Sequence, residues 1–179
     1  MEFSTGFSDN EEEIAGLFAA VFTASEGAGE GALIGGLVRA LLSGTPAEDI
    51  RVFTARDRGA LVGGAVFTRL CYEGDPRTVF LLSPMAVATD RQGEGIGQAL
   101  LRHALAALRA EGVDVAMTYG DPAFYGRTGF MPLSVATVPA PRPLSQPGGW
   151  VGQSLVGADM APFAGPCTCV AALDDPALW

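Results

Sequence analysis

The sequence contains no lysine and a single histidine, His103, among its 179 residues. Without lysine, a Schiff-base nucleophile and the lysine-bearing phosphate loop of ordinary nucleotide hydrolases are both excluded. One histidine cannot build a multi-histidine metal site, and any Ser–His or Cys–His catalyst would have to use it. These absences exclude pyridoxal-phosphate enzymes, class I aldolases and P-loop NTPases.

Basic side chains are scarce as well. The 11 arginines face 20 acidic residues, which gives a net charge of −9 and a pI near 4.4. Nucleic-acid phosphates favour a basic surface, so we expect no nucleic-acid partner. A local group of arginines could still hold one small anion.

Cysteines and long apolar stretches are few. Cys71, Cys167 and Cys169 cannot all pair with one another, and their spacing favours reduced thiols in a cytoplasmic protein without a metal. The apolar stretches fall short of the ~20 residues that span a bilayer. The acidic first residues also lack a signal-peptide pattern, so we expect no membrane association.

The periodicity of apolar residues predicts one α+β domain over residues 1–179. Ser8 and Glu11 form a capping-box pattern before the first helix, and a glycine-rich break at 26–31 follows it. We expect helices at 10–23, 33–42 and 95–110, a short helix in DPAFYGR (121–127), strands at 51–57, 60–70, 78–89, 113–119 and 130–138, a Pro-rich loop at 139–149, and tail strands at 153–157 and 167–173. The strand–helix–strand unit across 78–119 makes at least part of the sheet parallel.

Three alternating glycines join a strand to a helix at Gly93, Gly95 and Gly97. Amides at a helix start have no intrahelical partners and carry partial positive charge, so this turn suits a pyrophosphate without needing lysine. A plain strand-to-helix turn is one alternative. A dinucleotide-binding fold is another, but its glycines are spaced G-x-G-x-x-G, and the acidic residue at the required distance, Asp114, begins a strand instead of ending one.

Two motifs together resemble the GNAT superfamily of acyl-CoA-dependent N-acyltransferases. Gln92-x-x-Gly95-x-Gly97 matches its Q/R-x-x-G-x-G/A signature, and Tyr125-Gly-Arg-Thr-Gly-Phe130 lies where the family places Y-x-K/R-x-G-F. The resemblance covers roughly residues 10–138 and is most specific at 81–131, where the chain looks like a large bacterial subgroup of N-acetyltransferases. It implies a mixed, mostly antiparallel central sheet flanked by helices, with a splayed cofactor cleft in a 1–138 core followed by a 139–179 extension.

The resemblance also implies site residues for acetyl-CoA as acyl donor. The pantetheine arm would pair with backbone groups of Met85, Ala86 and Val87, and an N–H of Met85 or Ala86 would polarise the thioester carbonyl. Tyr125 would protonate the departing thiolate, although it could instead be a packed aromatic residue beside Phe124. The pyrophosphate would bind to amides of Gln92, Gly93, Glu94, Gly95, Ile96 and Gly97.

Neighbouring residues receive structural interpretations. We interpret Arg127 as solvated, Phe130 as core, and Asp121-Pro122 as the N-cap and first-turn proline of the short helix. Many family members carry an asparagine at the end of the preceding strand, where Thr118 and Gly120 stand here.

The general base and the acceptor stay open. Glu73, Asp75, Ser83 or a water chain could accept the proton of the attacking amine, whereas His103 is interpreted as structural. The loop 139–149 and Trp150 either wall the acceptor pocket or cover the sheet edge.

The leading hypothesis is direct transfer of acetyl from acetyl-CoA to a primary amine of a small molecule or peptide in a ternary complex. No cysteine is needed as an acyl carrier, and a homodimer is left open. The alternatives are a non-catalytic acyl-CoA-binding or sensing domain and a nucleotide-binding module of another class.

Overall fold

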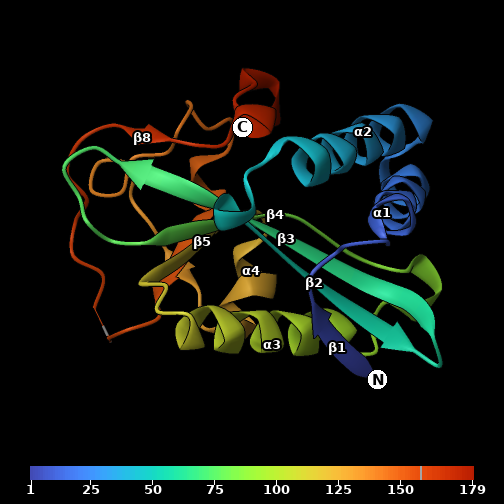
Figure 1. The fold of residues 1–179 in the computed structure, drawn as a ribbon. Coiled ribbons are helices and arrows are strands. Elements are labelled where there is room, and N and C mark those ends of the chain that lie inside the picture. Colours follow the sequence, from blue (N-terminus) through green and yellow to red (C-terminus); the bar gives the residue numbers. More distant parts are fainter. Residues whose placement is uncertain (158) are drawn as a thin grey trace. The chain divides into compact units, whose positions relative to one another are not determined.

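The computed structural model describes residues 1–157 and 159–179, which form four α-helices and eight strands. The strands hydrogen-bond in the order β1-β2-β3-β4-β5-β7-β6, and β8 pairs with β3 (Figure 1). This mixed arrangement confirms the predicted α+β class. The elements are β1 (Glu2–Thr5), α1 (Glu11–Glu26), α2 (Ala28–Gly44), β2 (Ile50–Asp57), β3 (Ala60–Tyr72), β4 (Val79–Val87), α3 (Ile96–Ala110), β5 (Val115–Tyr119), α4 (Pro122–Tyr125), β6 (Met131–Pro132), β7 (Trp150–Ser154) and β8 (Cys167–Thr168).

The predicted parallel crossover is present. β4 and β5 are parallel, in a register from Val79↔Val115 to Leu82↔Thr118, and α3 connects them along the chain. Strand β4 continues to Val87, beyond this register. β5 pairs antiparallel with β7, and β7 with β6.

The chain divides into two compact units. The first comprises Met1–Phe67 and Pro84–Ala104, and the second comprises Thr68–Ser83 and Leu105–Trp179. β3, β4 and α3 each begin in one unit and end in the other.

In the first unit, two consecutive glycines of β3 allow helices to approach both faces of the strand. A Cβ atom at Gly64 would lie 2.9 Å from Cε2 of Phe18 in α1, and one at Gly63 would lie 3.3 Å from Cδ2 of Leu100 in α3. Because successive strand residues point to opposite faces, α1 and α3 cover opposite sides of β3 (Figure 1). Phe18 and Leu100 are fully buried there.

At the N-terminal end of the chain one strand was missed and two predictions are wrong. Strand β1 was not predicted, and it pairs antiparallel with β2 from Glu2↔Arg56 to Thr5↔Phe53. The N-cap of α1 is Asn10 with no side-chain cap bond, so the Ser8–Glu11 capping box does not form. The expected break at 26–31 is the single residue Gly27, whose φ of 99° lets α2 begin at Ala28.

The predicted strand at 130–138 is also largely wrong. Only Met131–Pro132 forms a strand of the sheet. A turn follows at Ser134, whose backbone carbonyl accepts hydrogen bonds from the N–H groups of Thr137 and Val138. The predicted tail strands are shifted or shortened: β7 starts at Trp150 and ends at Ser154. β8 ends at Thr168, and a 3₁₀ turn follows at Ala171–Leu173.

Two aromatic residues in the second unit are core. Phe130 is buried, as predicted, and Trp150 is fully buried, with its Nε1 donating to the Val138 carbonyl at 2.9 Å. Among the described residues, none of the helices is both long enough and apolar enough to cross a bilayer.

Candidate functional site

The glycine-rich turn between β4 and α3 is built on left-handed backbone conformations. Gly93 and Gly95 have φ values of 82° and 80°. Residues with a Cβ atom adopt such positive φ values only with strain. A Cβ atom at either position would meet nothing within 4 Å, so backbone conformation and not crowding requires glycine. The same open space lets a ligand approach the turn.

The turn presents backbone donors at the start of α3. The N–H of Ala99 donates to the Gly95 carbonyl at 3.0 Å, which is the first bond of the helix. Amides that precede this bond have no intrahelical acceptor. Residues 92–95 are exposed, whereas Ile96 and Gly97 are buried. This geometry can bind an anion such as a pyrophosphate.

The Gln92 side chain ties the turn back to β4. Its Nε2 donates to the Val87 carbonyl at 3.1 Å, and the next amide along, Ala88 N–H, donates to the Val62 carbonyl of β3 at 2.9 Å. Since the C=O and N–H of one planar trans peptide point in opposite directions, the Val87 carbonyl points away from β3. The Gln92 amide group is therefore used to hold the loop.

The backbone N–H groups of Met85, Ala86 and Val87, the residues predicted to contact the pantetheine arm, do not all point to the same side of β4. The Ala86 carbonyl faces β3, 3.6 Å from where a Cβ atom of Gly63 would lie. In an extended strand the backbone groups of successive residues alternate sides. The N–H groups of Met85 and Val87 consequently point away from β3, and that of Ala86 points toward it.

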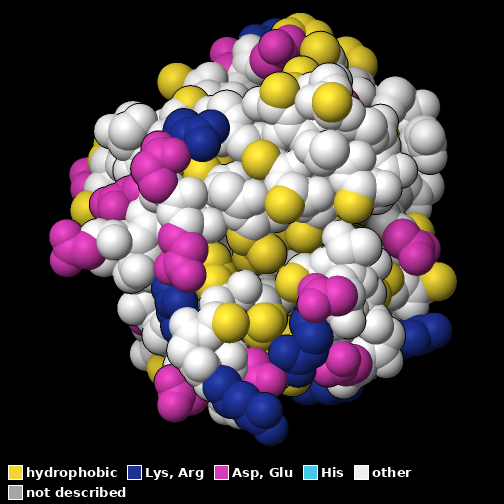
Figure 2. Space-filling model, turned by 90° about the vertical axis from the view of Figure 1, so that its right-hand side faces the viewer, with side chains coloured by type: hydrophobic (Ala, Val, Ile, Leu, Met, Phe, Trp, Pro, Cys, Tyr) yellow, Lys and Arg dark blue, Asp and Glu magenta, His cyan; other side chains and the backbone are white. Residues whose placement is uncertain are grey.

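The arginine beside the turn is neutralised by two acids. Arg91 bonds to Asp57 and to Glu94, each at an N···O distance of 3.0 Å, and both partners raise the pKa of its guanidinium. Other basic side chains of this unit are paired too: Arg39 with Glu12 and Arg56 with Glu13. Figure 2 shows basic and acidic side chains beside one another on this face. Arg91, the basic side chain of the turn, is therefore already paired with two acids, and the exposed amides of residues 92–95 remain as donors to an anion.

Tyr125 lies in the second unit at the end of α4. The helix has the predicted start: Pro122 follows Asp121, whose side chain accepts from the Ala123 N–H at 2.9 Å. The Tyr125 ring contacts Phe124 and Phe130, with ring centroids 5.1 Å and 5.7 Å away. Burial raises the pKa of its phenol. A neutral, half-buried phenol can donate a proton.

Thr118 stands near the position of the family asparagine and has a structural bond of its own. It is buried, and its Oγ1 donates to the Leu82 carbonyl at 2.9 Å, which links the paired strands β5 and β4. Arg127, in the turn after Tyr125, is exposed, in agreement with its interpretation as solvated.

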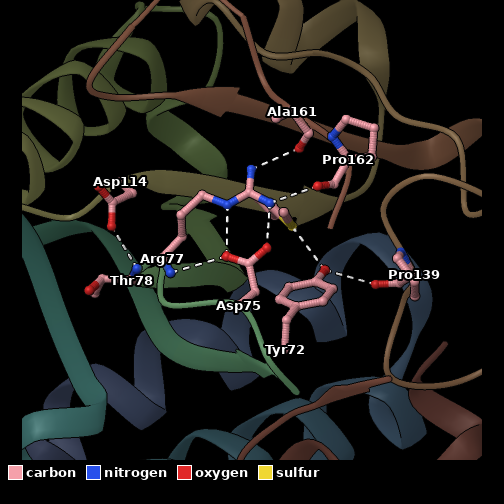
Figure 3. Close-up of polar contacts among 9 residues, drawn as sticks. Tyr72, Asp75, Arg77, Thr78, Asp114, Pro139, Ala161 and Pro162 are labelled. Carbon is pink, nitrogen blue, oxygen red and sulfur yellow. Dashed lines mark hydrogen bonds and ion pairs between the residues drawn. The ribbon is translucent and has the colours of Figure 1, made fainter. Parts of the chain in front are cut away.

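Asp75, a candidate base, is held by Arg77 instead. The two side chains form a bidentate pair with a closest distance of 2.6 Å (Figure 3). Arg77 lowers the pKa of the Asp75 carboxyl to about 2, so this carboxylate is a weak base. Arg77 also donates to the carbonyls of Ala161 and Pro162, at 2.7 Å and 2.9 Å. The pair therefore joins the β3–β4 hairpin to the C-terminal segment.

The remaining candidates have structural surroundings or are exposed. His103 stacks on Phe3 with centroids 5.5 Å apart and meets Phe53 edge-on, which agrees with its structural interpretation. Glu73 is exposed and Ser83 is half-buried. None of these positions identifies a base.

The cysteines are all free thiols. Burial raises the pKa of Cys167 to about 12 and also raises that of Cys169, which disfavours the thiolate form that a nucleophile needs. Within residues 1–157 and 159–179, no three His, Cys, Asp or Glu side chains are grouped as metal ligands.

A cavity lies at the end of β5, a location that sequence reasoning did not specify. It has a volume of about 580 Å³ and is lined by Tyr119, Gly120, Asp121, Pro122, Ser145, Gln146, Gly148 and Gly149. Part of the Pro-rich loop, residues 145–149, thus walls a cavity, whereas Trp150 does not line it. No local signal could have found it, because its two walls are about 25 residues apart in the sequence.

Comparisons with known proteins identify the same family that the two sequence motifs resemble. A family model described as acetyltransferase (GNAT) domain matches residues 48–132. The Escherichia coli K12 protein named uncharacterized N-acetyltransferase YjhQ is 33% identical over 128 residues, which cover 69% of this chain and 71% of YjhQ.

Solved structures share the fold. A GNAT family acetyltransferase from Brucella melitensis, crystallised in complex with acetyl-CoA, superposes with a TM-score of 0.74 at 25% identity over 97% of each chain. The E. coli GNAT family N-acetyltransferase YhbS, in complex with CoA, gives a TM-score of 0.70 at 19% identity over 97% of this chain and 92% of YhbS. These matches show the GNAT fold and not the dinucleotide-binding fold considered as an alternative. The chain belongs to the GNAT family of N-acetyltransferases and is an acyltransferase.

Proposed function

We propose that the protein transfers acetyl from acetyl-CoA directly to a primary amine, in a ternary complex, as a cytoplasmic enzyme. The observation that carries this proposal is the Gln92–Gly97 turn, in which left-handed glycines expose helix-start amides beside β4. The acetyl-CoA and CoA bound to the related Brucella and E. coli proteins support the choice of donor.

The donor would bind along β4 and the turn. The pyrophosphate would accept bonds from amides between Gln92 and Gly97, where the helix start favours negative charge. The pantetheine arm would pair with the backbone of Met85 and Val87, because their N–H groups point away from β3. The N–H of Ala86 points toward β3 and is less available. These residues lie past the end of the register with β5, which ends at Leu82.

The Met85 N–H is then the favoured donor to the thioester carbonyl. In direct transfer the amine nitrogen attacks this carbonyl carbon, and its oxygen becomes an oxyanion that a fixed backbone N–H stabilises. When the intermediate collapses, the C–S bond breaks and CoA leaves as a thiolate. Tyr125 would supply the proton to this sulfur, and its raised pKa keeps the phenol protonated at neutral pH. The attacking amine loses its own proton to water or to a base.

The first test of the proposal is binding of acetyl-CoA measured by calorimetry, followed by a panel of primary amines. Product should be detected as acetylated amine by mass spectrometry, because the exposed Cys71 thiol would react with thiol reagents used to detect CoA. We expect acetyl-CoA binding and intersecting initial-rate lines when both substrates are varied. Absence of acetyl-CoA binding would sink the proposal, and parallel lines would exclude direct transfer.

A further inference from the structure

The cavity at the end of β5 has no assigned ligand. Its volume of about 580 Å³ falls within the range of small-molecule sites, roughly 300–1,000 Å³. One wall is the end of β5 and the start of α4, residues 119–122, and the other is the loop 145–149. Both walls belong to the second unit.

The walls of this cavity are fixed by hydrogen bonds and stacking. The Tyr119 hydroxyl accepts from the Gln146 N–H at 2.7 Å and lies 2.9 Å from the Ser145 Oγ. The Tyr119 ring stacks on Trp179, with centroids 6.4 Å apart and planes 16° from parallel. The Gly120 N–H donates to the Gly149 carbonyl at 2.9 Å. The cavity is therefore largely formed before a ligand binds.

The charge of the lining is one-sided. Asp121 is the only charged side chain among the eight lining residues, all of which the structure describes. Its Oδ1 accepts the Ala123 N–H as the cap of α4, which leaves Oδ2 as a second acceptor. A ligand with a cationic group would gain an ion pair here, whereas a carboxylate or phosphate would meet like charge without a lining cation.

The cavity adjoins Tyr125. Gly120 lines the cavity, and a Cβ atom at Gly120 would lie 2.8 Å from Cε2 of the Tyr125 ring. Tyr125 thus packs against the lining residue Gly120 without itself lining the cavity. A molecule in the cavity would contact a direct neighbour of Tyr125.

We propose that this cavity binds the acceptor and selects a diamine: one amine reacts while a second ammonium group pairs with Asp121. This inference rests on the proposed acetyl transfer and adds the substrate class. Amines that carry a carboxylate in place of the second ammonium are rejected.

Two probes of equal chain length test the charge preference. Binding of 1,4-diaminobutane and of 4-aminobutanoate is measured by ligand-observed NMR, with acetyl-CoA affinity measured on the same preparations. Wild-type protein should bind the diamine, with 4-aminobutanoate at least tenfold weaker. Asp121→Asn keeps a capping side chain but should weaken diamine binding about 2- to 5-fold, as loss of an exposed ion pair does.

Asp175→Asn is the matched control. Asp175-Pro176-Ala177 repeats the same cap, with the Asp175 side chain accepting from the Ala177 N–H at 2.9 Å, and it does not line the cavity. This variant removes the same charge and should leave diamine binding unchanged. Equal weakening by both variants would mean that net charge alone attracts the diamine, and this would overturn the proposal.

Gly148→Leu tests the cavity by volume. A Cβ atom at Gly148 would meet nothing within 4 Å, so a side chain can be added at this lining residue without a clash at its first carbon. We expect at least a tenfold loss of diamine binding with acetyl-CoA affinity unchanged. Unaltered diamine binding in Gly148→Leu, or no diamine binding by a wild-type protein that binds acetyl-CoA, would overturn the acceptor site alone. Loss of acetyl-CoA binding in the wild type would instead overturn the proposed function.

Discussion

The ring of Tyr125 occupies the space that a side chain at Gly120 would need, since a Cβ atom there would lie 2.8 Å from the Tyr125 Cε2. Gly120 is therefore a positioning residue for Tyr125. We expect Gly120→Ala to displace the ring and to lower kcat about 10- to 100-fold, because small misplacements of a reacting group are costly. The KM for acetyl-CoA should change little.

A double variant separates positioning from general damage in this experiment. If Gly120 acts through Tyr125, Gly120→Ala adds little further loss of kcat to Tyr125→Phe. Multiplicative losses in the double variant would refute this role for Gly120.

Tyr125→Phe should itself remove the proposed proton donor while keeping the aromatic packing with Phe124 and Phe130. General acid catalysis contributes about 100- to 10,000-fold, and we expect kcat to fall by at least the lower figure, with acetyl-CoA affinity unchanged. Tyr72→Phe is the control, because the Tyr72 hydroxyl bonds to the Pro139 carbonyl at 2.8 Å in a structural role. Steady-state kinetics of wild type and both variants measure kcat. An unchanged kcat in Tyr125→Phe would show that Tyr125 is not the general acid.

Glu94 should limit the affinity of the turn for acetyl-CoA. Its carboxylate is half-exposed and pairs with Arg91, so Glu94→Gln removes a negative charge and releases one contact of that guanidinium. We expect the Kd for acetyl-CoA to fall about 2- to 5-fold at low salt, the scale of an exposed ion pair, and less at high salt. Calorimetry with acetyl-pantetheine, which lacks the pyrophosphate, is the control and should show no change.

The Asp75–Arg77 pair should stabilise the fold in a pH-dependent way. The folded-state pKa of Asp75 is lowered to about 2, so the pair contributes stability above the unfolded pKa of about 3.9 and loses it as pH falls toward 2. The two side chains are only 9% and 22% exposed, and a shift of this size corresponds to about 2 kcal/mol.

Urea unfolding of Asp75→Asn measures this contribution. The variant should be less stable than wild type by about that amount at pH 7, and the difference should disappear between about pH 4 and pH 2. Asp174→Asn breaks the more exposed pair with Arg142 and should cost less than about 1 kcal/mol. A difference for Asp75→Asn that persists unchanged at pH 2 would contradict the ion-pair origin.

Features that depend on neighbouring residues could be predicted from the sequence. The Asp121-Pro122 cap, the turn at Gly93 and Gly95 and the crossover through α3 each depend on residues near one another in the chain. The motifs Gln92–Gly97 and Tyr125–Phe130 were sufficient to indicate the family. The strand at 130–138 was mispredicted because Ser134 starts a turn that the apolar pattern does not reveal.

Features that depend on distant partners could not be predicted. Strand β1 forms because β2, about 50 residues later, offers a strand edge. Asp75 was a candidate base although its partner Arg77 is only two residues away. The distant part of this arrangement is the pair of carbonyls, more than 80 residues further along the chain, to which Arg77 also donates. The bond from the Gln92 side chain to the Val87 carbonyl joins residues only five apart, but it depends on the path of the turn, which the motif alone does not specify.

The sequence by itself determined the family and the chemistry available to it. Without lysine and with a single histidine, our proposal assigns anion binding largely to backbone amides and proton donation to Tyr125. These are local properties of residue type and backbone conformation. Only the tertiary structure decided which N–H groups of β4 face away from β3, which carboxylates are neutralised and where a cavity opens beside Tyr125. Those features arise from strand pairing and side-chain packing between residues that the sequence places far apart.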